Sequence, residues 1–382
     1  MKNIEYGIFM PVGSGGWIVS ENVPLLDGSY AYNKRVAQLS ERLGFDFTLS
    51  QAVWRGYPGP AHHFETNLES LTTSAGLAEA TSEIGVWSTV NTALIHPAVA
   101  AKMVATGSQI GAGRTGLNIV AGGNRVAERQ FGLGADLDNA LKYRRAAEWV
   151  EVVRALWSED SVDYDGEFFQ LRDAQSWPKP VGGAPQMICA ATSDTGLAFV
   201  AKHLDGVLFE GTTRDSVVAI GQRARRISRD NGDALKTYCV FMVIPGETDV
   251  DAQRRIDHYQ AGRDIGALRK MAEEWGAVTH DATAYRADNE GWFDATAIST
   301  GTVAGSPATI AEQLADMIEH ADVDGAVFIM PDFIDDLTVL GEEIVPALVR
   351  EGFGRIAARP ARAGAGRADQ NSSRFSRNVG PA

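Results

Sequence analysis

Residues 97–123 read PAVAAKMVATGSQIGAGRTGLNIVAGG, a pattern that predicts a helix, a turn and a strand in that order. The segment Pro97–Ile110 begins with proline at a first-turn position and predicts a helix. The run Thr115–Ala121 is short, apolar and rich in β-branched residues, and it predicts a strand. The glycine-rich stretch between them predicts a turn. The Gly122-Gly123 pair after the strand would let the backbone approach a ligand closely.

Short apolar runs alternate with longer amphipathic runs along the rest of the chain. The eight expected strands are Tyr6–Val12, Phe45–Ser50, Ile84–Val90, Thr115–Ala121, Gln186–Ala191, Gly206–Glu210, Tyr238–Ile244 and Gly325–Met330. The expected helices are Tyr30–Leu43, Glu69–Thr81, Pro97–Ile110, Asn139–Trp157, Asp194–His203, Thr213–Asp230, Thr248–Trp275, Pro307–His320 and Asp335–Arg350.

Near-continuous apolar strands that alternate with helices predict a parallel sheet buried on both faces. Eight such strands in a chain of 382 residues fit a (β/α)8 TIM barrel, which is the α/β fold that we predict. A doubly wound open sheet is the alternative, although such sheets more often have fewer strands. Functional groups of a TIM barrel lie at the carboxyl ends of its strands, so the candidate residues are sought there.

The composition is that of an ordinary globular protein, with 45% hydrophobic and 22% charged residues. No window approaches the 18 consecutive apolar residues of a membrane span. The net charge of −14 argues against nucleic acid as the main partner. The only cysteines, Cys189 and Cys239, each lie in an apolar run. This pattern excludes a disulfide framework and a cysteine-based metal site, and it favours the reducing cytoplasm.

We expect residues 1–352 to form the barrel domain with insertions. Asp165-Gly166 lies between two β-like runs and predicts a hairpin insertion. Residues 276–305 carry little periodicity and are interpreted as a lid over the barrel mouth. Residues 353–382 are interpreted as a disordered basic tail. From Arg355 onward, six arginines and one aspartate give a net charge of +5, which leaves −19 on the rest of the chain.

Three residues at the expected strand ends have chemistry of interest. Ser193 follows the fifth strand and opens a helix, where serine is most often an N-cap. The free N–H groups of the same helix end also make it a candidate phosphate site. Asn118 lies within an apolar strand and needs polar partners if it faces the barrel interior. Its alternative is an asparagine satisfied by neighbouring backbone. Thr89 at the third strand end is either an ordinary β-branched strand residue or a polar group that faces a ligand.

Other motifs have ordinary interpretations. Residues Gly111–Gly116 spell G-x-G-x-x-G, but a helix precedes them and a strand follows, which reverses the order of a dinucleotide site. We therefore predict a helix-to-strand turn there. The histidines His62, His63 and His203 have no further clustered ligand, so we expect no metal site.

Several runs together resemble the bacterial-luciferase-like superfamily of flavin-dependent enzymes. They are Thr81–Gly85, His96–Lys102, Gly113–Val120, Glu148–Trp157 and Tyr164–Phe169. Further runs resemble the pyrimidine monooxygenases of that superfamily, namely Phe9–Gly13, Phe45–Ser50, Asn67–Ser70, Ile188–Ala190 and Phe241–Asp249. The resemblance extends over most of residues 1–350. It implies a TIM barrel, reduced FMN as cofactor, dioxygen as co-substrate and oxidative opening of a uracil-like or thymine-like ring.

The resemblance also implies roles for individual residues. Ser193 and Tyr143 would hold the FMN phosphate, and Asn118 would contact the flavin ring. Glu128 is a further flavin-binding candidate that lies one position away from the matching family position. Leu49, Thr89 and Asn118 would line a dioxygen pocket and are the candidate catalytic residues.

Two departures from the family pattern concern the pocket. Ala52 and Val53, which we count among the candidate cofactor-binding residues, stand where the pyrimidine enzymes have an Ile-Lys pair. Gly123 stands where those enzymes have tryptophan. A pocket without the tryptophan would be larger, so we expect a ring larger than uracil, or poor turnover of uracil itself.

The resemblance leaves other activities open. Relatives that attack carbon–heteroatom bonds in sulfones or halogenated aromatics share the fold, as do deazaflavin-dependent dehydrogenases and non-catalytic flavin-binding proteins. Thr89 and Asn118 together favour a monooxygenase. We expect its partners to be an NAD(P)H-dependent flavin reductase, dioxygen, a small heterocyclic substrate and further copies of the chain, and neither nucleic acid nor a membrane.

Overall fold

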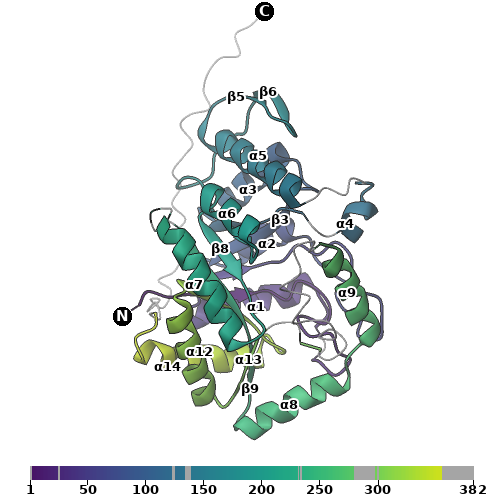
Figure 1. Cartoon of the computed structure of the whole chain (residues 1–382), viewed down its shortest axis with the longest axis vertical. Helices are drawn as coiled ribbons and strands as arrows, with labels where there is room; N and C mark the ends of the chain where they lie inside the picture. The colour runs from purple at the N-terminus through teal and green to yellow at the C-terminus, as the bar shows by residue number, and fades with distance from the viewer. Residues whose placement is uncertain are drawn as a thin grey trace, which may run out of the picture.

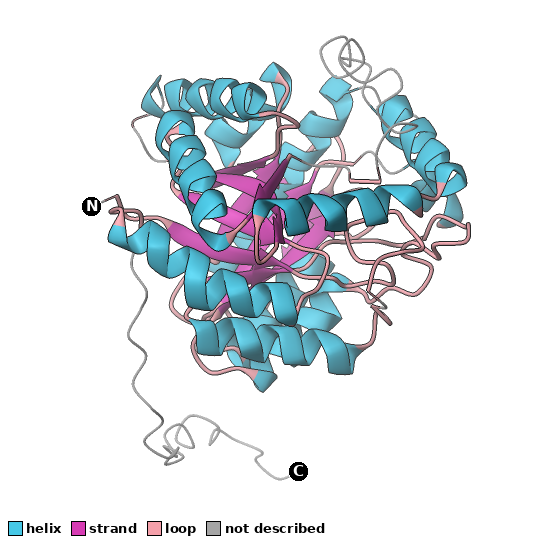
Figure 2. Cartoon of the chain, turned by 90° about the horizontal axis from the view of Figure 1, so that it is seen from below, coloured by secondary structure: helices cyan, strands magenta, loops and turns pink. Residues whose placement is uncertain are grey.

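The computed structural model describes residues 2–24, 26–122, 125–133, 139–230, 232, 235–278, 297–298 and 301–354. Eight parallel strands form a closed barrel that helices surround (Figure 1, Figure 2). Around the ring they are β1 (Glu5–Phe9), β2 (Phe47–Leu49), β3 (Gly85–Asn91), β4 (Thr115–Val120), β7 (Gln186–Ala190), β8 (Gly206–Phe209), β9 (Lys236–Pro245) and β11 (Gly325–Ile329). Pairing of β8 with β9, and of β11 with β1, closes the ring. The predicted TIM barrel is therefore confirmed, and the open-sheet alternative is wrong.

Most helices begin and end within two residues of the predicted bounds. They are α1 (Tyr30–Leu43), α2 (Ser70–Ala80), α3 (Pro97–Ile110), α5 (Asn139–Ser158), α6 (Asp194–His203), α7 (Arg214–Asp230) and α12 (Pro307–Ala321). The last predicted helix is present as α13 (Asp335–Val339), a π-helical turn (Leu340–Ile344) and α14 (Val345–Arg350). The predicted hairpin is β5 (Val162–Asp165) with β6 (Gln170–Ala174), and residues 111–114 form the predicted turn between α3 and β4.

Two expectations were wrong or incomplete. The single helix expected over Thr248–Trp275 is two helices, α8 (Asp249–Ala261) and α9 (Ile265–Val278). The chain turns between them because the Asp264 carboxylate accepts a hydrogen bond from the Ala267 N–H at 3.0 Å and begins a new helix. The sequence pattern also missed the short elements α4 (Arg125–Gln130) and β10 (Thr302–Gly305). Strand β10 pairs with β9 outside the ring.

Aromatic rings fill the amino-terminal half of the barrel interior. Phe47 stacks on Trp87 with ring centroids 4.1 Å apart, and Tyr238 packs edge-on against both rings at 5.7 Å. Glycine is required opposite them, because a Cβ atom at Gly7 would lie 2.4 Å from the Phe47 ring and one at Gly116 would lie 2.6 Å from the Trp87 indole. Because these rings fill the amino-terminal half of the barrel interior, the polar interior residues lie toward its carboxyl-terminal end.

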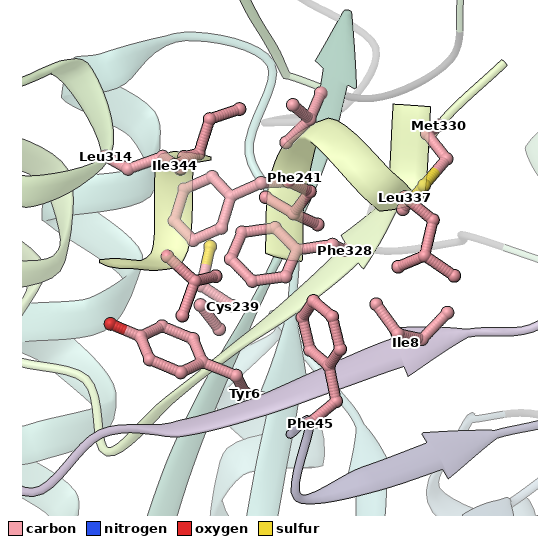
Figure 3. Packing of buried hydrophobic residues seen from close by; sticks show 14 of the residues in the cluster. Tyr6, Ile8, Phe45, Cys239, Phe241, Leu314, Phe328, Met330, Leu337 and Ile344 are labelled. Atoms are coloured by element: carbon pink, nitrogen blue, oxygen red, sulfur yellow. The ribbon is translucent and has the colours of Figure 1, made fainter. Parts of the chain in front are cut away.

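A second apolar layer joins the outside of the barrel to the helices around it. On the side of β1, β9 and β11, Tyr6, Phe45, Phe241 and Phe328 pack with Leu337 and its neighbours (Figure 3). Burial of one such side chain stabilises the fold by about 1.5–3 kcal/mol. Strands β1, β9 and β11 are thus packed on both faces, by the barrel interior and by the outer helices.

Parts of three expected features lie outside the described residues. They are residues 279–296 and 299–300 of the expected lid, residues 355–382 of the expected tail, and Gly123. The described ends of the expected lid belong to α9 and β10, and Ile298 pairs with Ile18. Within the described ranges, no helix is both long enough and apolar enough to cross a lipid bilayer.

Candidate active site

Thr89 and Asn118 lie side by side near the carboxyl ends of β3 and β4. They are register partners, and the Asn118 Nδ2 atom donates a hydrogen bond to Thr89 Oγ1 at 3.1 Å. Leu117 and Ile119 pack against the outer helices, so Asn118 between them faces the barrel interior. The two strand ends that the sequence predicted to converge therefore do so in the structure.

The pair is buried and incompletely hydrogen-bonded. Thr89 is 4% exposed and Asn118 is 3% exposed, and Asn118 Oδ1 is buried without a partner among the described residues. A buried acceptor of this kind is destabilising by about 1–3 kcal/mol unless something completes the bond. The pair is therefore suited to a ligand that donates a hydrogen bond to Asn118.

Leu49 supplies an apolar neighbour on the adjacent strand. It is the last residue of β2, it is fully buried in the barrel interior, and its register partner is Trp87, two residues before Thr89. The three predicted catalytic residues thus lie on three consecutive strands of the ring.

Ser193 and Tyr143 meet at the amino terminus of α6. Ser193 is the N-cap of this helix, and its Oγ atom accepts a hydrogen bond from the Gly196 N–H at 3.2 Å. A Cβ atom on Gly196 would lie 2.7 Å from the Tyr143 hydroxyl oxygen and 3.2 Å from Ser193 Oγ, so both hydroxyls border the same small space. Burial raises the pKa of Tyr143 to about 12, which keeps its hydroxyl a neutral donor. The two hydroxyls and the helix end form a cradle that suits a phosphate.

Arg223 of α7 also reaches this helix end, and sequence reasoning did not single it out. Its guanidinium donates to the Thr192 carbonyl and lies 3.4 Å from the Asp194 carboxylate. This cation offsets the charge of Asp194, which would otherwise oppose a bound phosphate. An arginine in an amphipathic helix is common, so the sequence carried no signal for this contact.

Glu128 lies in α4, and its carboxylate approaches the loop that follows β4. A Cβ atom at Gly122 would lie 3.5 Å from Glu128 Oε1 and 3.3 Å from Arg145 Nη2. Burial lowers the pKa of Arg145, and the neighbouring Glu128 carboxylate opposes this shift. Glu128 and Arg145 therefore border Gly122, two residues after the end of β4 and four after Asn118.

Ala52 and Val53 lie in the loop that follows β2. Val53 packs against a small apolar cluster formed by the loops after β1 and β2 and by α9; its members are Val19, Tyr57, Phe64, Ala267, Leu268 and Met271. Val53 thus packs against this cluster, and Ala52 is half-buried. Their assignment to a cofactor stays a prediction.

Further buried polar atoms lack partners in the described structure around the same strand ends. Gln51 Nε2 and Trp54 Nε1 follow β2, and Thr92 Oγ1 follows β3. The Trp54 ring packs edge-on against Phe131, with centroids 5.3 Å apart. Sequence reasoning placed these residues after strands but had no signal to distinguish them from ordinary loop residues. No group of three or more His, Cys, Asp or Glu side chains suited to a metal ion occurs in the part of the chain that the structure describes.

Comparison with known proteins agrees with this architecture. The family model described as luciferase-like monooxygenase matches residues 4–324. The pyrimidine monooxygenase RutA of Acinetobacter baylyi is 34% identical over 354 residues, which cover 90% of this chain and 95% of that protein. Riboflavin lyase RcaE, solved with modified FMN and riboflavin, has a similar fold with a TM-score of 0.82 at 19% identity, covering 93% of each chain. The EDTA monooxygenase EmoA from Chelativorans sp. BNC1 has a TM-score of 0.78 at 21% identity, covering 92% of this chain and 94% of that one. On this family match and this identity to a curated relative, the chain belongs to the luciferase-like monooxygenase family.

Proposed function

We propose that the protein is a two-component FMN-dependent monooxygenase that oxidatively opens a small heterocycle. Its reduced FMN would come from a separate NAD(P)H-dependent reductase, and dioxygen would be the co-substrate. The observation that carries the proposal is the buried Thr89–Asn118 pair, in which the side-chain oxygen Oδ1 of Asn118 has no hydrogen-bond partner among the described residues. The pyrimidine monooxygenases among the relatives support the substrate class.

The residues present fit FMN. The amino terminus of α6, Ser193 and Tyr143 would hold its phosphate, and Asn118 Oδ1 would contact its ring. Strands β4 and β7 are neighbours, with Asn118 in register with Ile188, so the phosphate cradle and the Asn118 amide belong to the same edge of the barrel. Reduced FMN, when bound, would supply the electrons that activate dioxygen.

The chain's own contribution is a donor and an acceptor in fixed positions. The bond from Asn118 Nδ2 occupies one lone pair of Thr89 Oγ1 and leaves the hydroxyl proton able to donate elsewhere. Such a donor would stabilise negative charge that develops on oxygen during the reaction, and it would act on rate more than on binding. Leu49 provides an apolar surface beside it, which suits dioxygen.

Substrate recognition would use two donors after β2 that have no acceptor in the described part of the chain. Gln51 Nε2 and Trp54 Nε1 are buried N–H groups that would each gain an acceptor from a carbonyl oxygen of a ring amide. Ala52 and Gly123, which replace larger side chains of the pyrimidine enzymes, favour a ring larger than uracil.

The test is turnover with a generic flavin reductase, NADH and FMN, on uracil, thymine and larger cyclic amides, with and without dioxygen. We expect ring-opened product only when reductase and dioxygen are both present. Product formation without dioxygen, with a reduced deazaflavin as hydride donor, would instead identify a dehydrogenase. Hydride transfer from NADPH to FMN by this chain alone would remove the separate reductase from the proposal.

A further inference from the structure

Ser70 joins two strand ends through its hydroxyl group. It is the first residue of α2, and its side chain is buried, with 1% of the residue exposed. Its Oγ atom accepts a hydrogen bond from the Thr89 N–H at 2.8 Å and donates one to the Ser50 carbonyl at 3.3 Å. One hydroxyl therefore connects the residue that follows β2 to the backbone of Thr89.

The Ser70 hydroxyl takes the place of a backbone hydrogen bond that β2 and β3 do not make. Strand β2 ends at Leu49, in register with Trp87, and the last bond between the two strands runs from the Ser50 N–H to the Trp87 carbonyl at 2.9 Å. The amide of Thr89 points to the same side of β3 as that of Trp87, because the residues are two apart in a strand. It therefore faces the side where β2 has ended, and Ser70 Oγ provides the acceptor that β2 does not.

A second serine of α2 forms a further hydrogen bond to Ser50. Ser74 lies one turn beyond Ser70 on α2, and its hydroxyl lies 2.8 Å from Ser50 Oγ. Ser50 and Ser74 are 1% and 4% exposed, so water is largely excluded from the network. The helix thus holds the ends of β2 and β3 through side-chain hydroxyls at the level of Thr89.

We propose that Ser70 is a positioning residue for Thr89. The Thr89 hydroxyl is carried on a β-branched side chain whose direction follows the backbone, so the bond to Ser70 fixes where Oγ1 meets Asn118. Removing the Ser70 hydroxyl leaves the Thr89 amide and the Ser50 carbonyl buried without this partner. The end of β3 then shifts, and the Thr89–Asn118 bond lengthens. The functional consequence rests on the proposed function, because it assumes that Thr89 assists oxygenation.

The experiment compares Ser70→Ala, Ser70→Thr and Ser40→Ala. Ser40 is a matched control, since it is equally buried and its hydroxyl, as far as the described residues go, donates only to the Val36 carbonyl of its own helix at 2.8 Å. The readouts are the fraction of flavin oxidation that yields product, the Kd for FMN, the Tm, and a crystal structure of Ser70→Ala.

For Ser70→Ala we expect the product fraction to fall about three- to ten-fold with FMN affinity within about two-fold. Ser70→Thr restores most of it, and Ser40→Ala leaves it unchanged. Adding Ser70→Ala to Thr89→Val causes no further loss, because both changes act through one hydroxyl. An unchanged product fraction in Ser70→Ala, or full additivity in the double variant, overturns the proposal.

The crystal structure separates this proposal from the proposed function. In Ser70→Ala we expect the distance from Asn118 Nδ2 to Thr89 Oγ1 to exceed about 3.5 Å, beyond hydrogen-bond range. A distance that stays at 3.1 Å overturns the positioning role whatever the enzyme does. If the unmodified protein oxygenates no compound, the proposed function fails, and this distance still decides the role of Ser70.

Discussion

Replacing Gly196 by alanine tests whether the cradle at α6 holds a phosphate. The added Cβ atom would lie 2.7 Å from the Tyr143 hydroxyl oxygen, 3.0 Å from the Ala191 Cβ and 3.2 Å from Ser193 Oγ. The first distance is too short for a real contact, so the Tyr143 hydroxyl must move away. The helix backbone itself tolerates the change, because alanine is a better helix former than glycine.

The expected loss follows from one hydrogen bond to a charged group. Such a bond stabilises by about 1.5–3 kcal/mol, which corresponds to about a 10- to 150-fold weaker Kd for FMN. Riboflavin lacks the phosphate, so its Kd should change by no more than about two-fold. The comparison of the two flavins therefore reports on the phosphate alone.

The assay is titration of flavin fluorescence with the unmodified protein, Gly196→Ala and a control, Gly107→Ala. Gly107 is also a helical glycine, but the nearest atom to its added Cβ is Thr115 Cγ2, in ordinary contact at 3.8 Å. We expect the control to bind both flavins normally. Equal losses for FMN and riboflavin in Gly196→Ala, or no loss for FMN, would refute the assignment of the phosphate to this helix end.

Three other predictions concern catalysis and stability. Thr89→Val keeps the side-chain shape and removes the hydroxyl. We expect FMN affinity within about two-fold but at least a ten-fold loss of product, with electrons diverted to hydrogen peroxide. If the fraction of flavin oxidation that yields product is unchanged, Thr89 is an ordinary strand residue. Burial lowers the pKa of His63 to about 3, below the value of about 6.5 in the unfolded chain. Protonation therefore favours the unfolded chain, so the free energy of unfolding is highest above pH 6.5 and decreases as the pH falls toward 3. Urea unfolding at pH 7, 6, 5 and 4 should show a slope of up to about 1.4 kcal/mol per pH unit from this group, and a His63→Phe variant with the same slope would contradict its origin. Asp336→Asn disrupts a bidentate ion pair, in which Arg255 Nη1 and Nη2 lie 2.7 and 2.9 Å from the Asp336 carboxylate oxygens. We expect the free energy of unfolding to fall by about 2–4 kcal/mol. A loss below about 1 kcal/mol would show that the ion pair contributes little.

The parts of the fold that could be predicted have a local signal. A near-continuous apolar run such as Gly325–Ile329, flanked by amphipathic helices, indicates a buried parallel strand whatever its neighbours are. The division between α8 and α9 has no such signal, because the amphipathic pattern continues through Gly262 and the break depends on the Asp264 cap. Strand β10 is only four residues long and forms because β9 extends beyond the ring to pair with it.

Some residues of the candidate site could likewise be predicted from the sequence, and others could not. Thr89 and Asn118 stand out in the sequence because a polar residue in a buried strand is uncommon, and neighbouring strand ends must meet at one edge of a barrel. Ser70 and Arg223 do not stand out, since serine at a helix start and arginine on a helix are ordinary. Their importance comes from the Thr89 amide and the Thr192 carbonyl, which are 19 and 31 residues away in the chain.

By itself, the sequence determined the barrel and the order of its strands along the chain, because strand and helix periodicity is set by neighbouring residues. It also determined the family resemblance, which rests on short runs of residues. Only the tertiary structure decided which polar atoms are paired and which are not. Whether Asn118 Oδ1 or Gln51 Nε2 has a partner depends on atoms that folding brings from distant segments. The polar atoms at the ends of β2, β3 and β4 that lack partners within the described ranges are therefore a property of the folded chain, and they locate the candidate site.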